Sequence, residues 1–432
     1  MDRVPDKPFD IWDGLAFAAS VLIVLLYGQI WFAPLTGYGQ ASADPLKAVF
    51  YPAYMLAIAL VLLRPGETLR ILKRSPWLVA LILLVIASNV WSIAPDKTLR
   101  RTLALVCTSL AGIALAARWS WPRFLEVLAT AFAVMCVLSL MLAVLKPDWG
   151  RMTELFPGAW RGVWVEKNSL GSVMALAAVT QIAAAVVTPR RAMVWSGGAA
   201  LSVFLVLMST SKTSLVVLLL ALAALSFMAV FKGGPLRAVV GGWVAVVGVA
   251  GAAVVLTLAW RIAFDLLGKD ATLTGRTKVW SGILNQMPSH YSTGFGYGAV
   301  WDDKSSFGPA MHVAREALFL PAHAHNGWLE VLLALGLPGV VLMALWLAET
   351  WMRSIWSAFT SPAGWFALPF TLIYSVNMLT ESVTLNWHDL WWVMFVAVSS
   401  RLALGVDPDP AYRPSSRRAA GRRRLAVRPA PA

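Results

Sequence analysis

Long runs of apolar residues recur along almost the whole chain, and they constrain its fold more than any other feature. A membrane-spanning helix needs about 20 consecutive, mostly apolar residues. Only 13% of the 432 residues are charged, whereas about 25% is usual in a soluble domain. We therefore predict an all-α polytopic membrane protein with about 12 transmembrane helices. The predicted spans are 12–33, 47–63, 76–91, 102–117, 122–145, 169–188, 193–209, 213–231, 238–260, 326–350, 363–381 and 388–404.

Basic residues indicate which connections lie in the cytoplasm, because short cytoplasmic loops carry an excess of Lys and Arg. The first apolar run has no cleavage site after it, so we expect a span rather than a signal peptide. Residues 1–404 are the predicted membrane domain, with both termini inside. Residues 405–432 are a predicted disordered basic tail that lies near anionic lipid and binds no nucleic acid. The cations predicted to be inside are Arg64, Arg70, Lys73, Arg74, Arg118, Arg123, Arg190, Arg191, Lys232, Arg237 and Arg353.

Other cations fall on the outer side, where this rule gives them no reason to be. Some of them are expected to be ordinary solvated loop charges. The alternative is an anion site at the outer membrane surface, because guanidinium groups bind phosphate in bidentate fashion. These cations are Lys97, Arg100, Arg101, Arg151, Arg161, Lys167, Lys212, Arg261, Lys269, Arg276, Lys278, Lys304 and Arg315.

The longest connection, at about 261–325, lies between the ninth and tenth predicted spans on the outer face. Loops of this length are usually functional or disordered. Its aromatic and aliphatic content, which includes Trp280, Tyr291 and Trp301, favours a folded loop over disorder. The spacing in 277–287 predicts a helix, and the glycines at 294, 296 and 298 predict turns.

His325-Asn326 opens the tenth span, and Gly336 and Gly339 follow deeper in the same segment. Pro338 should bend that helix. The positive end of a helix dipole disfavours an imidazolium, so we expect a neutral His325 that can act as a general base. Glu330, one turn further along, is expected to orient this group. The plainer alternative is that His325 and Asn326 only cap the helix.

The remaining polar residues give weaker signals. His290, His312, His323 and His388 are interpreted as loop or interface residues, and Asp389 and Glu381 as unranked functional candidates. Asp302 and Asp303 form a poor candidate for a metal pair, so we expect no metal and no cofactor. Cys107 and Cys136 are interpreted as inert residues within spans.

Several short motifs together resemble the O-antigen ligase and polymerase superfamily, and in particular exopolysaccharide polymerases of the ExoQ type. The resemblance covers roughly residues 85–350, and Gly327-Trp328 departs mildly from the family pattern that follows His-Asn. The matching segments are Trp91-Ser92, Leu99-Arg100-Arg101, 162–171 (GVWVEKNSLG), 209–214 (STSKTS), Leu273-Thr274-Gly275-Arg276 with Trp280, 294–298 (GFGYG), and His325-Asn326 with Gly336 and Gly339.

The resemblance implies a glycosyltransferase of the bacterial inner membrane, with a donor oligosaccharide carried on undecaprenyl diphosphate at the periplasmic face. The acceptor would be another glycan, for a polymerase, or lipid A–core, for a ligase; a chain-length regulator protein is a possible partner. His325 would take the proton of the acceptor hydroxyl, and Arg276 would stabilise charge on the diphosphate. The expected substrate-binding residues are Arg100, Arg101, Arg161, Lys167, Asn168, Lys212, Asn326 and Glu330.

Two other classes of function remain open. Twelve spans are also typical of transporters, whose sites lie near the bilayer midplane. Against this, the predicted midplane is nearly free of charge, with Gln181 and Asn377 as its main polar residues, and the chain has no evident internal repeat. A structural assembly subunit without catalysis is the third class.

Overall fold

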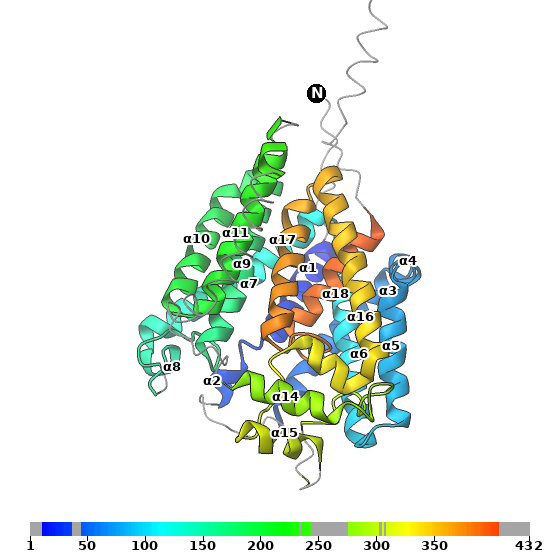
Figure 1. Ribbon diagram of the computed structural model, residues 1–432. Coiled ribbons are helices and arrows are strands. Elements are labelled where there is room, and N and C mark those ends of the chain that lie inside the picture. Colours follow the sequence, from blue (N-terminus) through cyan, green and yellow to red (C-terminus); the bar gives the residue numbers. More distant parts are fainter. Residues whose placement is uncertain are drawn as a thin grey trace, which may run out of the picture.

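The computed structural model describes residues 11–36, 45–154, 156–232, 236–237, 239–242, 275–301, 305 and 308–405. These residues are almost entirely helical and form no strand beyond an isolated bridge between Arg151 and Trp160. The long helices stand side by side as a bundle, and α14 and α15 lie across one end of it (Figure 1). The predicted all-helical fold is thereby confirmed. In chain order the helices are α1 (Ile11–Tyr27), α2 (Phe32–Thr36), η1 (Pro45–Phe50), α3 (Tyr51–Leu63), α4 (Pro65–Arg74), α5 (Pro76–Ala87), η2 (Ser88–Val90), α6 (Pro95–Arg118), α7 (Trp121–Leu145), α8 (Pro147–Gly150), α9 (Lys167–Val187), η3 (Pro189–Arg191), α10 (Ala192–Met208), α11 (Lys212–Lys232), α14 (Arg276–Gln286), α15 (Pro309–Ala317), α16 (Gly327–Thr360), α17 (Gly364–Thr380) and α18 (Leu390–Leu404).

Each predicted span except the ninth coincides with a helix, although some boundaries differ. α1 ends at Tyr27 rather than Ala33, and α16 continues to Thr360. Among the described residues, six helices are long and apolar enough to cross a membrane, or seven if Ala48–Leu63 and Pro65–Arg74, bent by 95°, form one broken span. The total of twelve spans therefore stays a prediction. The ninth, 238–260, and the tail beyond Gly405 lie largely outside the described residues.

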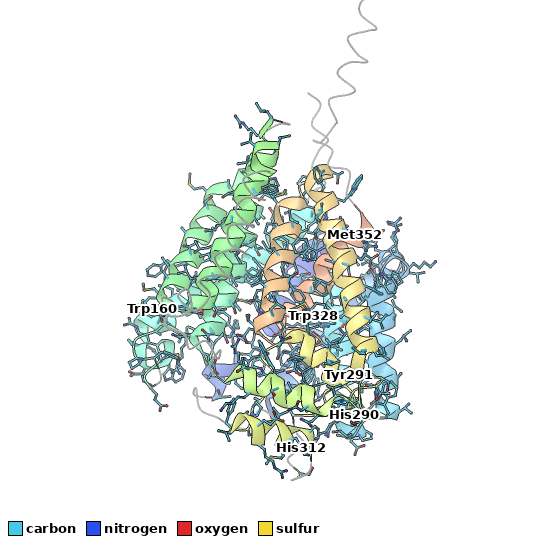
Figure 2. All side chains as sticks on the ribbon, in the orientation of Figure 1. Trp160, His290, Tyr291, His312, Trp328 and Met352 are labelled. Carbon is cyan, nitrogen blue, oxygen red and sulfur yellow. The ribbon has the colours of Figure 1, made fainter. Side chains whose placement is uncertain are left out.

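The two ends of the bundle can be told apart by their contacts. At one end, Arg118 of α6 pairs with Asp13 of α1. At this same end the Arg401 guanidinium of α18 lies 5.9 Å from the ring centroid of Trp121, the first residue of α7. We call this the arginine end, and the opposite end, which α14 and α15 cover, the site end. Figure 2 shows Met352 towards the arginine end, and His290 and His312 at the site end.

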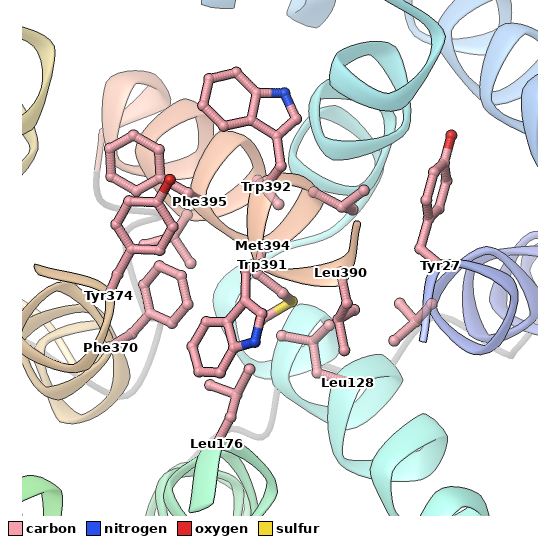
Figure 3. Close-up of a cluster of buried hydrophobic side chains, with 14 of the residues drawn as sticks. Tyr27, Leu128, Leu176, Phe370, Tyr374, Leu390, Trp391, Trp392, Met394 and Phe395 are labelled. Carbon is pink, nitrogen blue, oxygen red and sulfur yellow. The ribbon is translucent and has the colours of Figure 1, made fainter. Parts of the chain in front are cut away.

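Aromatic side chains hold α16, α17 and α18 together inside the bundle, and several of them are drawn in Figure 3. The rings of Tyr374 and Phe395 stack 4.2 Å apart, and Trp346 lies 4.5 Å from Phe395. Aromatic pairs contribute about 0.5–1.5 kcal/mol each beyond the area that they bury. This core therefore fixes the middle of α16 and the last turns of α17, and the chain continues from α17 into the residues of the candidate site.

α16 is interrupted at Gly336, which has φ +64° and non-helical geometry. The predicted bend is therefore present, and Pro338 contributes to it because it has no N–H to offer the carbonyl of Ala334. The backbone groups freed by the break bond to the loop before α15 instead. The three bonds run from the N–H of Phe295 to the carbonyl of Leu333 (2.8 Å), from Gly296 to Ala334 (3.1 Å), and from Leu337 to Tyr291 (2.7 Å).

The glycine-rich stretch 294–298 fits tightly between this break and the start of α6. A Cβ on Gly294 would lie 2.6 Å from the carbonyl carbon of Ala334, and one on Gly296 would lie 2.5 Å from the side chain of Ser92. The N–H of Ile93 donates to the carbonyl of Phe295 at 3.1 Å. The loop thus joins two segments that are far apart in the sequence, and only glycine leaves enough room for it.

The described part of the long loop is folded, as predicted. The helix expected at 277–287 is α14, which packs against α15 through a small apolar cluster that includes Val279, Ile283 and Val313. Asn285 also donates to Glu316 across this pair at 2.9 Å. The first part of the loop, with Arg261 and Lys269, lies outside the described residues, as do Asp302, Asp303 and Lys304.

We expect Gly336→Ala to lower the free energy of unfolding by more than about 2 kcal/mol. A Cβ there would lie 2.5 Å from the carbonyl oxygen of Tyr291, on a residue whose φ is already positive. Two controls separate the effect of the close contact from the effect of the positive φ. Gly158→Ala has positive φ but open space and should cost about 1 kcal/mol. Gly197→Ala lies in open helix and should be neutral or slightly stabilising. Unfolding in detergent measures all three, and a Gly336→Ala variant as stable as Gly158→Ala would contradict the packing argument.

Candidate active site

A cavity of about 1050 Å³ lies at the site end of the bundle. Its walls come from the starts of α9, α11 and α16, the end of α17, and the loops around Tyr297 and Trp387. Segments that are distant in the sequence meet here because the helix directions alternate. Of the predicted site residues, the cavity is lined by Arg101, Asn168, Arg276, His325 and Glu330, and not by Arg100, Arg161, Lys167, Lys212 or Asn326.

Glu381 joins the two residues that the sequence assigned to catalysis. Its Oε1 lies 3.3 Å from Nη2 of Arg276, and its Oε2 lies 3.3 Å from Nδ1 of His325. Arg276 also donates from Nη1 to the carbonyl of Thr380 at 2.7 Å. Burial raises the pKa of Glu381, but the hydrogen bond from His325 and the charge of Arg276 outweigh it and hold that pKa below its ordinary value. Glu381 is therefore ionised at neutral pH.

This carboxylate sets the tautomer of a neutral His325. The Nδ1–H donates to Glu381, so Nε2 carries the lone pair and is the proton acceptor. A carboxylate behind a histidine is the arrangement that orients a general base in many active sites. His325 lines the cavity with a side chain that is 38% exposed, so a substrate can reach the ring.

Two neighbours hold the backbone around His325. The Asn326 side chain accepts hydrogen bonds from the N–H groups of Trp328 and Leu329, at 2.9 and 3.2 Å, so it caps α16. Glu330 accepts the N–H of Ala324 at 2.6 Å, Nε1 of Trp301 at 2.9 Å and the hydroxyl of Ser382 at 3.0 Å. The turn can therefore hold His325 at φ +50°, which is an uncommon conformation for a residue with a side chain.

His323 lies against the ring of His325, with the two ring centroids 3.9 Å apart. Burial, together with the nearby charges of His325 and Arg276, lowers the pKa of His323 to about 4. It is therefore neutral near pH 7. Its Nδ1 accepts the backbone N–H of His325 at 3.3 Å, so His323 helps to hold the turn that carries His325.

Arg101 forms part of another wall of the cavity. Its guanidinium stacks over the ring of Trp387 at 4.5 Å and donates to the carbonyl of Gly298. The ring of Trp387 meets that of Tyr297 edge to face, with centroids 5.9 Å apart. Arg100, its neighbour in the sequence, is exposed and lies outside the cavity.

The other predicted cations lie around the starts of α9 and α11. Arg161 donates to the carbonyls of Trp149 and Asp148, at 2.8 and 3.0 Å, so it braces its own loop. Lys167 bonds to the hydroxyl of Thr210 and lies 3.7 Å from the ring centroid of Phe156. The contact of Lys167 with Thr210 brings the predicted motifs 162–171 and 209–214 together. Lys212, in the second motif, is the first residue of α11.

Of the remaining histidines, His290 and His388 pack against aromatic rings. His290 stacks on Phe295 with centroids 4.0 Å apart, and His388 stacks on Phe50 at 3.8 Å and bonds to Tyr54. His312 is exposed on α15. Glu381 is the residue whose importance the sequence did not reveal: its position at the end of a span marked it as a candidate, but no motif linked it to His325.

The chain is similar to known proteins over much of its length. Residues 162–344 match the family model described as O-antigen ligase. The predicted resemblance is therefore confirmed. The chain is also 25% identical over 334 residues to the exopolysaccharide production protein ExoQ of Rhizobium meliloti (strain 1021). The aligned segment covers 73% of this chain and 71% of that protein. The family segment contains Arg276 and His325, whereas Arg101 and Glu381 lie outside it.

The depressed pKa of His323 predicts a pH-dependent stability. The unfolded chain takes up a proton near pH 6.5 but the folded protein only near 4. The unfolded state therefore binds more protons in this window, and the free energy of unfolding should fall as the pH is lowered from 6.5 to 4. His323→Asn should make the thermal unfolding temperature less sensitive to acid in this window. The matched change at exposed His312 should leave the wild-type pH profile intact, and an unchanged profile in His323→Asn would refute the assignment.

Proposed function

We propose that this protein is a membrane glycosyltransferase that transfers an oligosaccharide from undecaprenyl diphosphate to a glycan acceptor, as a polymerase. The observation that carries the proposal is the contact of Glu381 with both His325 and Arg276 inside a cavity large enough for a glycan. A base oriented by a carboxylate, next to a fixed cation, suits a reaction that removes a proton and releases a diphosphate.

The proposed reaction proceeds in one displacement. Nε2 of His325 takes the proton of an acceptor hydroxyl while its oxygen attacks the anomeric carbon of the donor. The new glycosidic bond forms as the bond between that carbon and the diphosphate oxygen breaks. Undecaprenyl diphosphate leaves with its electron pair, and Arg276 stabilises the added negative charge, with Arg101 as the second cation on the cavity wall. Glu381 stabilises the imidazolium that results.

The charge distribution supports an outward-facing site. Arg74, Arg353 and Arg118 lie at the arginine end, where Arg353 donates to the carbonyl of Arg74 at 2.6 Å. If that end faces the cytoplasm, as an excess of cations in short loops favours, the cavity faces the periplasm of the bacterial inner membrane. A lipid-linked diphosphate could then reach Arg276 from the bilayer surface.

The relation to an exopolysaccharide production protein favours polymerisation, because the product of such a system is a long glycan. The family description favours the alternative, ligation of the glycan to lipid A–core. The two reactions share the donor and the site chemistry, and they differ in the acceptor. The substrates supplied in a reconstituted system therefore distinguish them.

Polymer should form when the purified protein in liposomes receives undecaprenyl-diphosphate-linked oligosaccharide alone. In a polymerase the same molecule serves as donor and acceptor, so gel analysis should show a ladder of glycans without added lipid A–core. Product that appears only after lipid A–core is added would establish the ligase and reject the polymerase.

His325→Ala should lower the turnover rate by about 10²–10⁴-fold, which is the usual contribution of a general base. Arg276→Ala should lower it by about 10²–10³-fold, because a preorganised charge is lost. Glu381→Gln should also slow the reaction, since the neutral amide does not stabilise the imidazolium and can present either its oxygen or its NH2 group to Nδ1 of the neutral ring. His312→Ala, on the exposed face of α15, is the matched control and should turn over normally. Normal turnover in a folded His325→Ala protein would exclude the proposed base.

A further inference from the structure

One wall of the cavity is made of neutral amide and hydroxyl side chains rather than cations. It comes from α9, α11 and α17, and α17 packs against both of the other helices. The Asn168 carbonyl oxygen accepts a hydrogen bond from Ser211 at 2.8 Å, which orients its amide group. Among the residues of this wall are Asn168, Ser172, Thr213, Ser214 and Asn377.

Asn377 has an unusual position within this wall. It lies in the last turn of α17 and is only 2% exposed, yet it lines the cavity. Among the residues that the structure describes, none accepts a hydrogen bond from its Nδ2. Its backbone carbonyl accepts the N–H of Glu381 at 2.7 Å, so the orphan amide lies one helical turn before the carboxylate that orients His325.

Two neighbouring polar side chains of α17 have partners within the protein, whereas the hydroxyl of Thr380, like the Asn377 amide nitrogen, has none among the described residues. Ser375 donates to the carbonyl of Thr371 at 2.8 Å and accepts Nε1 of Trp351 at 3.0 Å. Thr371 donates to the carbonyl of Ala367 at 2.7 Å. Burying an unpaired amide donor destabilises the folded state. A leucine would fill the same space without that cost, so stability alone does not explain an asparagine at this position.

We propose that Asn377, together with Asn168 on the same wall, forms a subsite that binds the hydroxyl groups of the glycan next to the reacting sugar. Sugar hydroxyls both donate and accept hydrogen bonds, and so do amide and hydroxyl side chains. Arg276 and Arg101 provide the charge that a diphosphate requires. The cavity therefore offers neutral groups to the glycan and charged groups to the diphosphate of one substrate. This inference rests on the proposed function, because it assigns a part of the same site to the glycan.

The test measures binding of two probes to the wild-type protein and to Asn377→Leu in detergent. One probe is undecaprenyl diphosphate, which has no sugar, and the other is the undecaprenyl-diphosphate-linked oligosaccharide purified from cells. Asn377→Leu should weaken binding of the oligosaccharide by about tenfold and leave binding of the carrier unchanged. Equal losses for both probes, or no loss for either, would overturn the proposed subsite.

The unfolding temperature of Asn377→Leu provides a second measurement. A purely structural role for Asn377 predicts a lower unfolding temperature, whereas the proposed subsite does not. Removing an orphan donor should leave the unfolding temperature of the unliganded protein unchanged or raised. Ser375→Ala is the matched control on the same helix: it should lower the unfolding temperature, because Trp351 loses its acceptor, while both affinities stay at wild-type values. An unliganded Asn377→Leu protein that unfolds at a lower temperature than the wild type would mark Asn377 as structural.

Asn168→Ala keeps the proposal testable if Asn377→Leu does not fold, because Asn168 is exposed at the start of α9. It should show the same selective loss of oligosaccharide binding, and an unchanged affinity would overturn the two-residue subsite. The binding measurement is independent of turnover. If the wild-type protein binds the oligosaccharide but forms no product, the proposed function fails. The binding of the two probes to the variants still tests whether the subsite exists.

Discussion

The break in α16 is the constraint on which the site end of this protein depends. A helix that loses its own hydrogen bonds inside a membrane bundle must find other partners, because unpaired backbone groups are costly in an apolar environment. The stretch 291–296 supplies those partners. In doing so it draws the long loop onto the bundle, positions Tyr297 and Gly298 beside Arg101, and connects α16 to the start of α6. The glycines at 294, 296 and 336 allow the backbones to approach closely enough for these bonds to form.

Glu381 then converts a folded scaffold into a chemical site. It lies just after α17, which the aromatic core holds against α16 and α18. One carboxylate contacts both a guanidinium and an imidazole, so each partner restricts the orientation of the other. The three side chains lie at or next to the ends of α14, α16 and α17, and this anchoring gives the fixed geometry that a precise proton transfer requires. Asn377, on the same helix, buries an amide nitrogen without a partner beside the cavity, and costs of this kind are common at functional sites.

The cations show why residue type and position in the sequence were only partly informative. Arg161, Lys167 and Arg101 all looked alike as outer charges near span ends. Arg101 lies on the cavity wall. Arg161 instead donates to carbonyls of its own loop, and Lys167 donates to the hydroxyl of Thr210. Whether a long basic side chain faces a cavity depends on local packing, and no spacing rule encodes that. Asn377 is a similar case: it was taken as a polar residue of the midplane, and it lies in the last turn of α17, on the cavity wall.

The amino-acid sequence was sufficient for the features that depend on neighbouring residues. Apolar runs predicted the helices, the glycine and proline pattern predicted the bend in α16, and local motifs indicated Arg276 and His325. The pairing with Glu381 could not be derived in this way, because that residue lies 56 positions beyond His325 and 105 beyond Arg276. Contacts over such separations exist only after the helices have packed, since each side chain is placed by the helix that carries it. The cavity and its combination of charged and neutral lining residues are likewise products of that packing.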